Sequence, residues 1–249
     1  MTTGIYHRAD GTFLNYEKEE RNSPGLVYLH GLMSSKDSKK GVFLKETAKR
    51  LGLSYLSFDF SGHGQSWGQP QDIQIGRCLR DAMEMIEQLT TGPQILLGSS
   101  MGGWIALLTA IRLSHRIAGV VGLAAGPDFT KWIWNDLLSE EYRDRLRNGE
   151  ILGPSEETHG YCFTYDLFKD SEAYFLLDKP ISYTGPVVLL NGDKDLFVPP
   201  KIAFQIKDQL VSSDVDVRII KGAEHALSTP SELQKIENAI MYLLKKKEK

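Results

Sequence analysis

Ser100 of this 249-residue sequence lies in a Gly-x-Ser-x-Gly pattern, in which the central serine could act as a nucleophile. The pattern, Gly98–Gly102, follows the apolar run Ile95–Leu97 and opens an apolar segment with helical spacing. A strand-to-helix turn of this kind strains its central residue, exposes the hydroxyl above a sheet and requires small residues on both sides. The N–H of Met101 then points at an oxyanion from a helix N-terminus. The pattern therefore predicts that Ser100 attacks a carbonyl carbon and that Met101 is an oxyanion-hole donor.

A second copy of the pattern, Gly64–Gly68, lies in a glycine-rich segment. Pro70 follows two residues later, and no helical pattern begins there. A turn without a following helix lacks the helix N-terminus that a nucleophile elbow requires. We therefore expect Ser66 to belong to a tight loop and not to a catalytic site.

The chain also supplies the two partners that a nucleophilic serine needs. A serine hydroxyl requires a base to take its proton, and a third group orients that base. In sites of this type the residues follow in the order Ser, Asp or Glu, His. The apolar runs Val187–Leu190 and Val215–Ile220 are followed by two aspartates and by His225, respectively. Because parallel strands end at one edge of the sheet, where ligands bind, we predict that His225 is the base for Ser100.

Two aspartates follow Val187–Leu190, and both are candidates for the acid. Asp193 and Asp195 lie in the same Asn-Gly-Asp-Lys-Asp turn. We favour Asp195, because it lies deeper in the turn, just before the Leu-Phe-Val-Pro segment that leads into the next helix. Asp193 can instead accept hydrogen bonds from its own backbone, as aspartates in turns commonly do.

A histidine and a glycine follow the apolar run Leu26–Leu29. Gly31 allows the backbone to approach a substrate closely, and the N–H of Leu32 is the second predicted oxyanion donor. We therefore place His30 and Gly31 in the substrate site. The His30 side chain is expected to hold the loop and not to perform chemistry.

The elements that must position these residues alternate between short apolar runs and longer amphipathic segments. The runs are mostly continuous and bulky, which is typical of strands buried on both faces of a parallel sheet. The weakly alternating segment Thr12–Glu17 is expected to form an edge strand that pairs with Ile5–Arg8 across Asp10-Gly11. The other expected strands are Leu26–Leu29, Tyr55–Phe58, Ile95–Leu97, Val120–Ala124, Val187–Leu190 and Val215–Ile220, and the expected helices are Gly41–Leu51, Cys78–Leu89, Met101–Leu113, Pro200–Leu210 and one from Pro230. This order predicts an α/β fold with a mostly parallel, doubly wound sheet.

One stretch, at about residues 127–183, interrupts this alternation. It is rich in aromatic residues and shows no strand pattern, so we expect an insertion of short helices. We interpret residues 1–249 as a single domain in which this insertion forms a small helical cap. The cap is expected to supply an apolar acyl pocket in which Trp132 and Trp134 bind substrate.

The composition argues against several classes of protein. The 29 Lys and Arg and 32 Asp and Glu give a net charge of −3, whereas nucleic-acid binders depend on clustered cations. No apolar run approaches the roughly 18 residues that span a bilayer, so we expect no stable membrane insertion. The first twenty residues lack a signal-peptide pattern and are acidic, and the only cysteines are Cys78 and Cys162. We therefore expect a reduced, cytoplasmic protein.

Neither a metal nor a cofactor is expected. No spacing of histidines and carboxylates matches a metal site. The short glycine pattern Gly62-His-Gly64 is followed by no helix, so it does not predict a dinucleotide site.

Together these motifs resemble the α/β-hydrolase family, and the resemblance extends from about Gly25 to Leu244. The motifs are Leu29-His-Gly-Leu-Met-Ser-Ser35, Phe58-Asp-Phe-Ser-Gly62, Gly98-Ser-Ser-Met-Gly-Gly103, Gly192-Asp-Lys-Asp195 and His225. They are similar, more narrowly, to the subgroup of the mitochondrial palmitoyl-protein thioesterase that also acts as mycophenolic acid acyl-glucuronide esterase. The resemblance implies an α/β-hydrolase fold with Ser100 as nucleophile, Asp195 as acid and His225 as base.

The activity that follows is hydrolysis of carboxylic esters or acyl thioesters, without a cofactor, through an acyl-enzyme intermediate. The substrate would be a small acyl ester or an acylated protein. Alternatives are an acyl-glucuronide esterase or other small-ester hydrolase, a non-hydrolytic reaction such as acyl transfer, and a non-catalytic ligand-binding homologue. Because every catalytic position is filled, the sequence favours an enzyme over the binding protein. The oligomeric state is not predicted.

Overall fold

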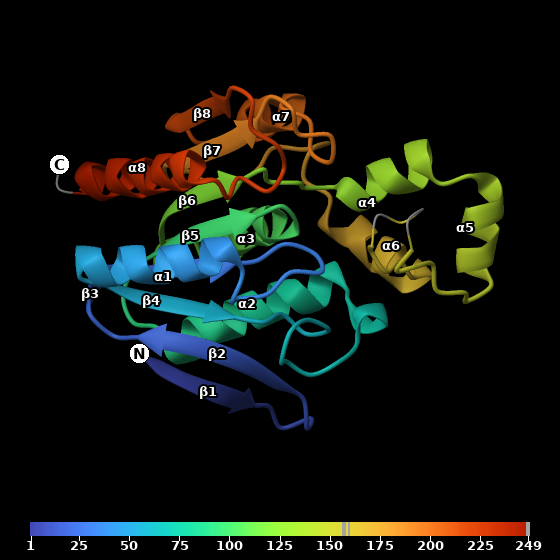
Figure 1. Ribbon diagram of the computed structural model, residues 1–249, viewed down its shortest axis with the longest axis horizontal. Helices are drawn as coiled ribbons and strands as arrows, with labels where there is room; N and C mark the ends of the chain where they lie inside the picture. The colour runs from blue at the N-terminus through green and yellow to red at the C-terminus, as the bar shows by residue number, and fades with distance from the viewer. Residues whose placement is uncertain (156–157, 159, 248–249) are drawn as a thin grey trace.

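The computed structural model describes residues 1–155, 158 and 160–247. Its centre is an eight-stranded sheet in the order β1-β2-β4-β3-β5-β6-β7-β8 (Figure 1). The strands are β1 (Thr2–His7), β2 (Phe13–Glu19), β3 (Asn22–Leu29), β4 (Leu53–Phe58), β5 (Gln94–Ser99), β6 (Ile117–Leu123), β7 (Val187–Gly192) and β8 (Val215–Ile220). β1 and β2 pair antiparallel, and β2 also runs antiparallel to β4; the remaining neighbours are parallel. The predicted doubly wound, mostly parallel sheet is therefore confirmed.

Continuous apolar runs form the middle of this sheet. Every residue of β5 and of β7 is buried, which explains why their sequences do not alternate. β1 and β2 form the predicted edge pair, in which His7 lies opposite Phe13. β8 closes the other edge, and most of its residues are only partly buried.

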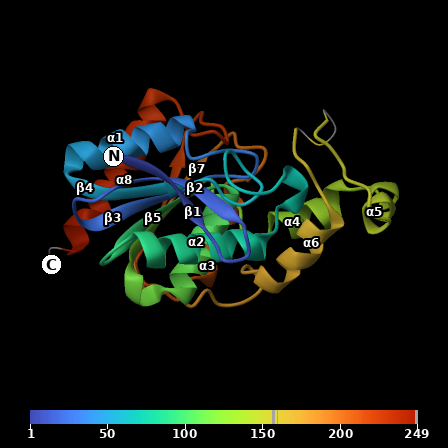
Figure 2. The ribbon, with the colours of Figure 1, turned by 90° about the horizontal axis from the view of Figure 1, so that it is seen from below.

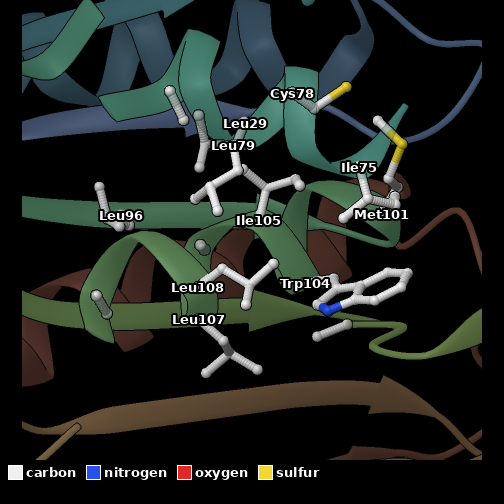
Figure 3. Packing of buried hydrophobic residues seen from close by; sticks show 14 of the residues in the cluster. Leu29, Ile75, Cys78, Leu79, Leu96, Met101, Trp104, Ile105, Leu107 and Leu108 are labelled. Atoms are coloured by element: carbon white, nitrogen blue, oxygen red, sulfur yellow. The ribbon is translucent and has the colours of Figure 1, made fainter. Parts of the chain in front are cut away.

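Helices cover both faces of the sheet, so the molecule has three layers (Figure 2). α1 (Lys39–Leu51) and α8 (Pro230–Lys247) pack on one face. α2 (Ile75–Leu89), α3 (Met101–Arg112) and α7 (Lys201–Gln209) pack on the other. Figure 3 shows side chains of α2 and α3, among them Cys78, Ile105 and Leu108, packing with Leu29 and Leu96 of the sheet. All the helices expected from apolar spacing are present.

The segment between β6 and β7 contains the short helices that the sequence predicted. They are α4 (Phe129–Trp132), a π-helical turn (Ile133–Leu137), α5 (Glu140–Arg147), α6 (Tyr165–Ser171) and a 3-10 turn (Glu172–Tyr174). In Figure 1 they lie to the right, beyond the carboxyl ends of the parallel strands. These are the ends from which the loops carrying Ser100, Asp195 and His225 leave the sheet.

Trp104 on α3 fastens this segment to the core. Its indole N–H donates to the carbonyl of Tyr174 at 3.0 Å, and its ring stacks on Phe175 and meets Phe129 edge-on. The buried carboxylate of Asp128 accepts hydrogen bonds from the backbone N–H groups that follow Phe175. These contacts fix the start and the end of the segment above the sheet edge. Within the described part of the chain, we find no helix that is both long and apolar enough to cross a membrane.

Candidate active site

Ser100 occupies the sharp turn between β5 and α3. Its φ of 54° and ψ of −118° lie outside the regions that non-glycine residues favour, as expected for a strained nucleophile turn. A Cβ on Gly98 would lie 2.3 Å from the carbonyl oxygen of Gly102, and one on Gly102 would lie 2.1 Å from that of Leu29. The two flanking glycines are therefore required by close backbone packing.

The second Gly-x-Ser-x-Gly copy forms a loop, as expected. Ser66 is buried, its hydroxyl donates to the carbonyl of Asp59 at 2.6 Å, and its oxygen accepts the N–H of Asn15 at 2.9 Å. Both hydrogen-bonding roles of the hydroxyl are thus occupied by backbone. Ser66 holds the loop after β4 against β2 and is not available to attack a substrate.

The structure brings Ser100, His225 and Asp195 together from three different loops. Nε2 of His225 lies 3.1 Å from the Ser100 hydroxyl, and its Nδ1 lies 2.8 Å from a carboxylate oxygen of Asp195. A carboxylate oxygen only accepts, so the proton on the ring lies on Nδ1. Nε2 of the neutral ring is then free to accept the serine proton, which is the geometry that a general base requires.

The two candidate acids have different surroundings. Asp195 is buried, and its second oxygen, Oδ1, accepts the backbone N–H groups of Phe197 at 2.9 Å and Val198 at 2.8 Å. Asp193 is exposed and accepts the N–H of Gly222 at 2.6 Å. Asp195 therefore contacts the imidazole of His225. Asp193 instead holds Gly222, at the beginning of the loop that carries His225.

A lysine from α1 holds the far side of the same loop. Nζ of Lys40 donates to the carbonyl of Ala226, the residue after His225. Burial lowers the pKa of Lys40 to about 8. With Asp193 at one end and Lys40 at the other, the loop holds His225 in place over Ser100.

The predicted oxyanion donors flank Ser100. Met101 is the first residue of α3, so its N–H has no acceptor within the helix. Gly31 lies against the serine: a Cβ there would come within 3.3 Å of the Ser100 Cβ and of the Ser99 carbonyl oxygen. This close approach places the next residue, Leu32, at the wall of the cavity that contains Ser100. Both N–H groups therefore belong to segments that border the serine hydroxyl.

His30 braces the loop and does not line the substrate site. It is fully buried, its Nδ1–H donates to the carbonyl of Gly31 at 2.8 Å, and its Nε2 accepts the N–H of Phe60 at 3.1 Å. Burial lowers the pKa of His30 to about 4, so the ring is neutral at pH 7. The structure places the His30 side chain away from the serine cavity, because both ring nitrogens are committed to backbone.

A second buried histidine, His63, should make folding sensitive to acid. Its ring lies 4.9 Å from that of His30, and burial, together with His30, lowers its pKa to about 3. An unfolded histidine takes up a proton near pH 6.5, so stability is lost as pH falls from about 6.5 toward 3. We expect His63→Phe to reduce the loss of unfolding free energy between pH 7 and pH 5 by about 2 kcal/mol. Urea titrations at the two pH values measure this, and an equal loss in both proteins would contradict it.

Ser100 and His225 open into a cavity of 50 Å³, which we call the serine cavity. Its other lining residues are Leu32, Phe129, Trp132, Ile133, Tyr161, Phe163, Phe197 and Val198. These side chains are apolar except for the Tyr161 hydroxyl and the indole N–H of Trp132. Burial, and then the charge of Asp195, raises the pKa of Tyr161, so this hydroxyl stays protonated. The cavity is therefore suited to an uncharged, apolar group next to the serine.

Only one of the two predicted tryptophans contributes to this cavity. Trp132 lines it, but Trp134 lies in a separate cavity of 410 Å³, where the Arg147 guanidinium sits 5.4 Å from its ring centre. Residues two apart on a helix point about 200° apart, so both cannot face the same space. Of the two tryptophans, the structure therefore places only Trp132 at the cavity of Ser100.

The sequence interpretation missed the contribution of the loop after Asp195. Phe197 and Val198 line the serine cavity, and the Phe197 ring lies 5.3 Å from that of His225. Leu196 is 86% exposed and Phe197 is 42% exposed. An apolar pair placed in a loop directly after the acid is a signal that would have pointed to these residues.

A parallel sheet that carries a serine elbow, with an aspartate and a histidine on later loops at the same edge, is the arrangement of the α/β-hydrolases. A sequence profile described as alpha/beta hydrolase fold matches residues 24–171, and the chain belongs to this family. It is accordingly an enzyme of the hydrolase class. The resemblance found in the sequence motifs is thereby confirmed.

Within the family, the chain is similar to proteins named palmitoyl-protein thioesterase ABHD10, mitochondrial. It is 34% identical to the protein from Bos taurus over 241 residues, which cover 96% of this chain and 79% of the bovine protein. It is 33% identical to the Homo sapiens protein over 242 residues, with the same coverage. The solved structure of alpha/beta hydrolase domain-containing protein 10 from mouse matches with a TM-score of 0.90 and 30% identity, over 99% of each chain.

These relatives contradict the predicted cytoplasmic location. The proteins from Bos taurus, Rattus norvegicus and Homo sapiens are all named as mitochondrial. The cytoplasmic prediction depended on the missing signal-peptide pattern, the acidic first twenty residues and the presence of only two cysteines, and it was wrong.

Proposed function

We propose that this hydrolase is a serine esterase or thioesterase whose nucleophile is Ser100. The observation that carries the proposal is the continuous hydrogen-bonded chain from Asp195 through His225 to Ser100, at 2.8 and 3.1 Å. As Ser100 Oγ attacks the acyl carbonyl carbon, Nε2 of His225 takes the hydroxyl proton. Asp195 keeps the ring in the correct tautomer and stabilises the imidazolium that forms.

The remaining steps use the same groups. The tetrahedral intermediate collapses, its C–O or C–S bond breaks, and the leaving group takes the proton from His225. Water, deprotonated by His225, then attacks the acyl ester on Ser100 and releases the acid. The N–H groups of Leu32 and Met101 stabilise the oxyanion during both acylation and deacylation. Losing one such donor typically raises the activation free energy by about 3 kcal/mol.

The substrate class follows from the cavity and from the relatives. The serine cavity is apolar, and the ABHD10 relatives are named palmitoyl-protein thioesterases. We therefore propose acyl thioesters and acyl esters, on small molecules or on proteins, as substrates. Residues 127–183 act as a cap on a single domain of residues 1–249, and their side chains Phe129, Trp132 and Tyr161 supply part of the acyl site.

A fluorophosphonate probe tests the nucleophile and the reaction together. We expect one label per chain, on Ser100, and hydrolysis of both p-nitrophenyl acetate and an acetyl thioester. Mass spectrometry of the labelled peptide identifies the site. Labelling elsewhere would contradict the assignment, and a labelled protein that hydrolyses neither substrate would favour the ligand-binding alternative.

A further inference from the structure

The loop that carries His225 contains strained backbone two residues later. Leu227 has a φ of 44°, in the left-handed region that non-glycine residues adopt only at a cost in free energy. Its side chain is buried in the core, in a cluster that includes Leu44 of α1 and Ile236 of α8. A bulky residue keeps such a conformation only where its surroundings impose it. Contacts of the neighbouring backbone must therefore contribute to holding Leu227.

The peptide group that joins Ala226 to Leu227 is the one that this φ angle orients. The angle describes rotation about the bond from the Leu227 nitrogen to its Cα, so relief of the strain would turn this planar group. Nζ of Lys40 donates a hydrogen bond to its oxygen, the carbonyl oxygen of Ala226. Lys40 therefore restrains the rotation by which the strain could be relieved. Because Ala226 follows His225 directly, the same rotation would displace the imidazole from Ser100.

Lys40 reaches this carbonyl from an element outside the triad. It is the second residue of α1, and α1 lies beside α8 on one face of the sheet (Figure 1). The loop after His225 leads into α8. Lys40 is not among the residues that line the serine cavity. The lysine thus ties the histidine loop to a neighbouring helix without contacting the space that the substrate occupies.

Burial and one acidic side chain determine the charge on Lys40. Burial lowers its pKa to about 8, and the charge of Glu232 on α8 acts in the opposite direction. The titratable side chains of the loop itself are His225 and the exposed Lys221 and Glu224. Lys40 is therefore mainly an ammonium ion at pH 7, and it loses its charge as the pH rises through about 8.

The strength of the restraint depends on that charge. A hydrogen bond from a charged nitrogen is roughly twice as strong as one between neutral groups. An ammonium group has only donors, whereas a neutral amine also has a lone pair and can turn another way. Deprotonation of Lys40 therefore weakens the hold on the Ala226 carbonyl without removing the side chain.

We propose that Lys40 is a positioning residue for catalysis: its ammonium group holds the strained peptide between Ala226 and Leu227, and thereby keeps His225 within reach of Ser100. The inference rests on the proposed role of Ser100. A displacement of about 1 Å in a catalytic group can cost about a hundredfold in rate. Because Lys40 does not line the serine cavity, its loss should affect kcat and not KM.

Replacing Lys40 tests this role at pH 7. We expect Lys40→Met, which keeps the length of the side chain but not the ammonium, to lower kcat for p-nitrophenyl acetate by roughly tenfold or more and to change KM by less than about threefold. Lys40→Arg keeps a charged donor and should retain at least about a third of the wild-type kcat. Lys39→Met is the matched control, because Lys39 is the exposed preceding residue on the same helix, and it should leave both constants unchanged.

The pH profile separates a charge-dependent restraint from simple packing. The kcat of the wild type should fall as the pH rises through about 8, because Lys40 then loses its proton. A guanidinium stays charged throughout this range, so Lys40→Arg should lack that fall. Lys40→Met should be low at pH 7 already and should also lack it. Rates between pH 7 and pH 9.5, corrected for spontaneous hydrolysis, give the three profiles.

The wild-type protein separates failure of this role from failure of the nucleophile. A wild type that is inactive on p-nitrophenyl acetate would overturn the role of Ser100 and that of Lys40 with it. An active wild type with the same kcat as Lys40→Met, or with an alkaline fall that Lys40→Arg shares, would overturn the role of Lys40 alone. If Lys40→Met does not fold, the profiles of the wild type and Lys40→Arg decide between these outcomes.

Discussion

Ser100→Ala is expected to lower kcat for ester hydrolysis by on the order of 10⁴-fold or more and to leave the fold intact. The hydroxyl is the only group of the triad that forms a bond to the substrate, and alanine cannot replace it. The substitution also removes the hydrogen bond to His225 Nε2 but leaves the backbone turn and its two glycines unchanged. Initial rates on p-nitrophenyl acetate measure the effect, and circular dichroism with urea unfolding checks the fold.

Ser66→Ala is the control from the other copy of the motif. It removes a buried hydroxyl that accepts the N–H of Asn15 and donates to the carbonyl of Asp59. Leaving these backbone groups unpaired should cost about 1–3 kcal/mol of stability. The turnover of the folded fraction should remain that of wild type. Equal losses of turnover at the two serines would refute the choice between the motifs.

The central site could be predicted from sequence because its geometry follows from local pattern and chain order. The elbow at Ser100 is defined by a strand, a glycine pair and a helix within a few residues. Asp195 and His225 each follow a recognisable apolar run, and a parallel sheet brings the ends of such runs to one edge. The same reasoning separated Ser66, whose loop leads only into a short 3-10 turn, Pro70–Asp72, and not into an α-helix.

Element boundaries were less predictable where packing overrides apolar spacing. β6 begins at Ile117, three residues before the predicted start, and it includes Gly119. A Cβ there would lie 3.0 Å from a methyl of Leu243 on α8, so the glycine serves close packing and does not end the strand. α2 likewise begins at Ile75, before the first residue of the expected apolar stripe.

The cap residues were the least predictable part of the site. Aromatic content indicated an apolar insertion but not which ring faces Ser100, since that depends on helix phase and on tertiary contacts. The structure places Trp132 at the wall of the serine cavity and Trp134 in a separate cavity. Phe197 lies in a loop with no periodicity, so only the apolar pair Leu196-Phe197 directly after the acid could have indicated its contribution.

Asp195→Asn is expected to lower kcat at neutral pH by about 10⁴-fold, although the side chain changes by one atom. Two backbone N–H groups, those of Phe197 and Val198, point at one oxygen of Asp195, so the amide oxygen of asparagine must take that side. The amide NH₂ then faces Nδ1 of His225. Because the NH₂ group donates, Nδ1 must accept, and the ring proton moves to Nε2. Nε2 then has no lone pair with which to take the Ser100 proton. Steady-state rates on p-nitrophenyl acetate and the rate of fluorophosphonate labelling both report the loss.

Asp193→Asn is the matched control and decides between the two acids. Asp193 accepts one N–H, from Gly222, and an amide oxygen can accept it as well, so kcat should change by only a few-fold. The unfolding free energy of both variants should stay near that of wild type, because each keeps its backbone hydrogen bonds. A large loss at Asp193 with little effect at Asp195 would transfer the role of the acid to Asp193. Comparable small effects at both positions would mean that His225 takes the serine proton without a carboxylate to fix its tautomer.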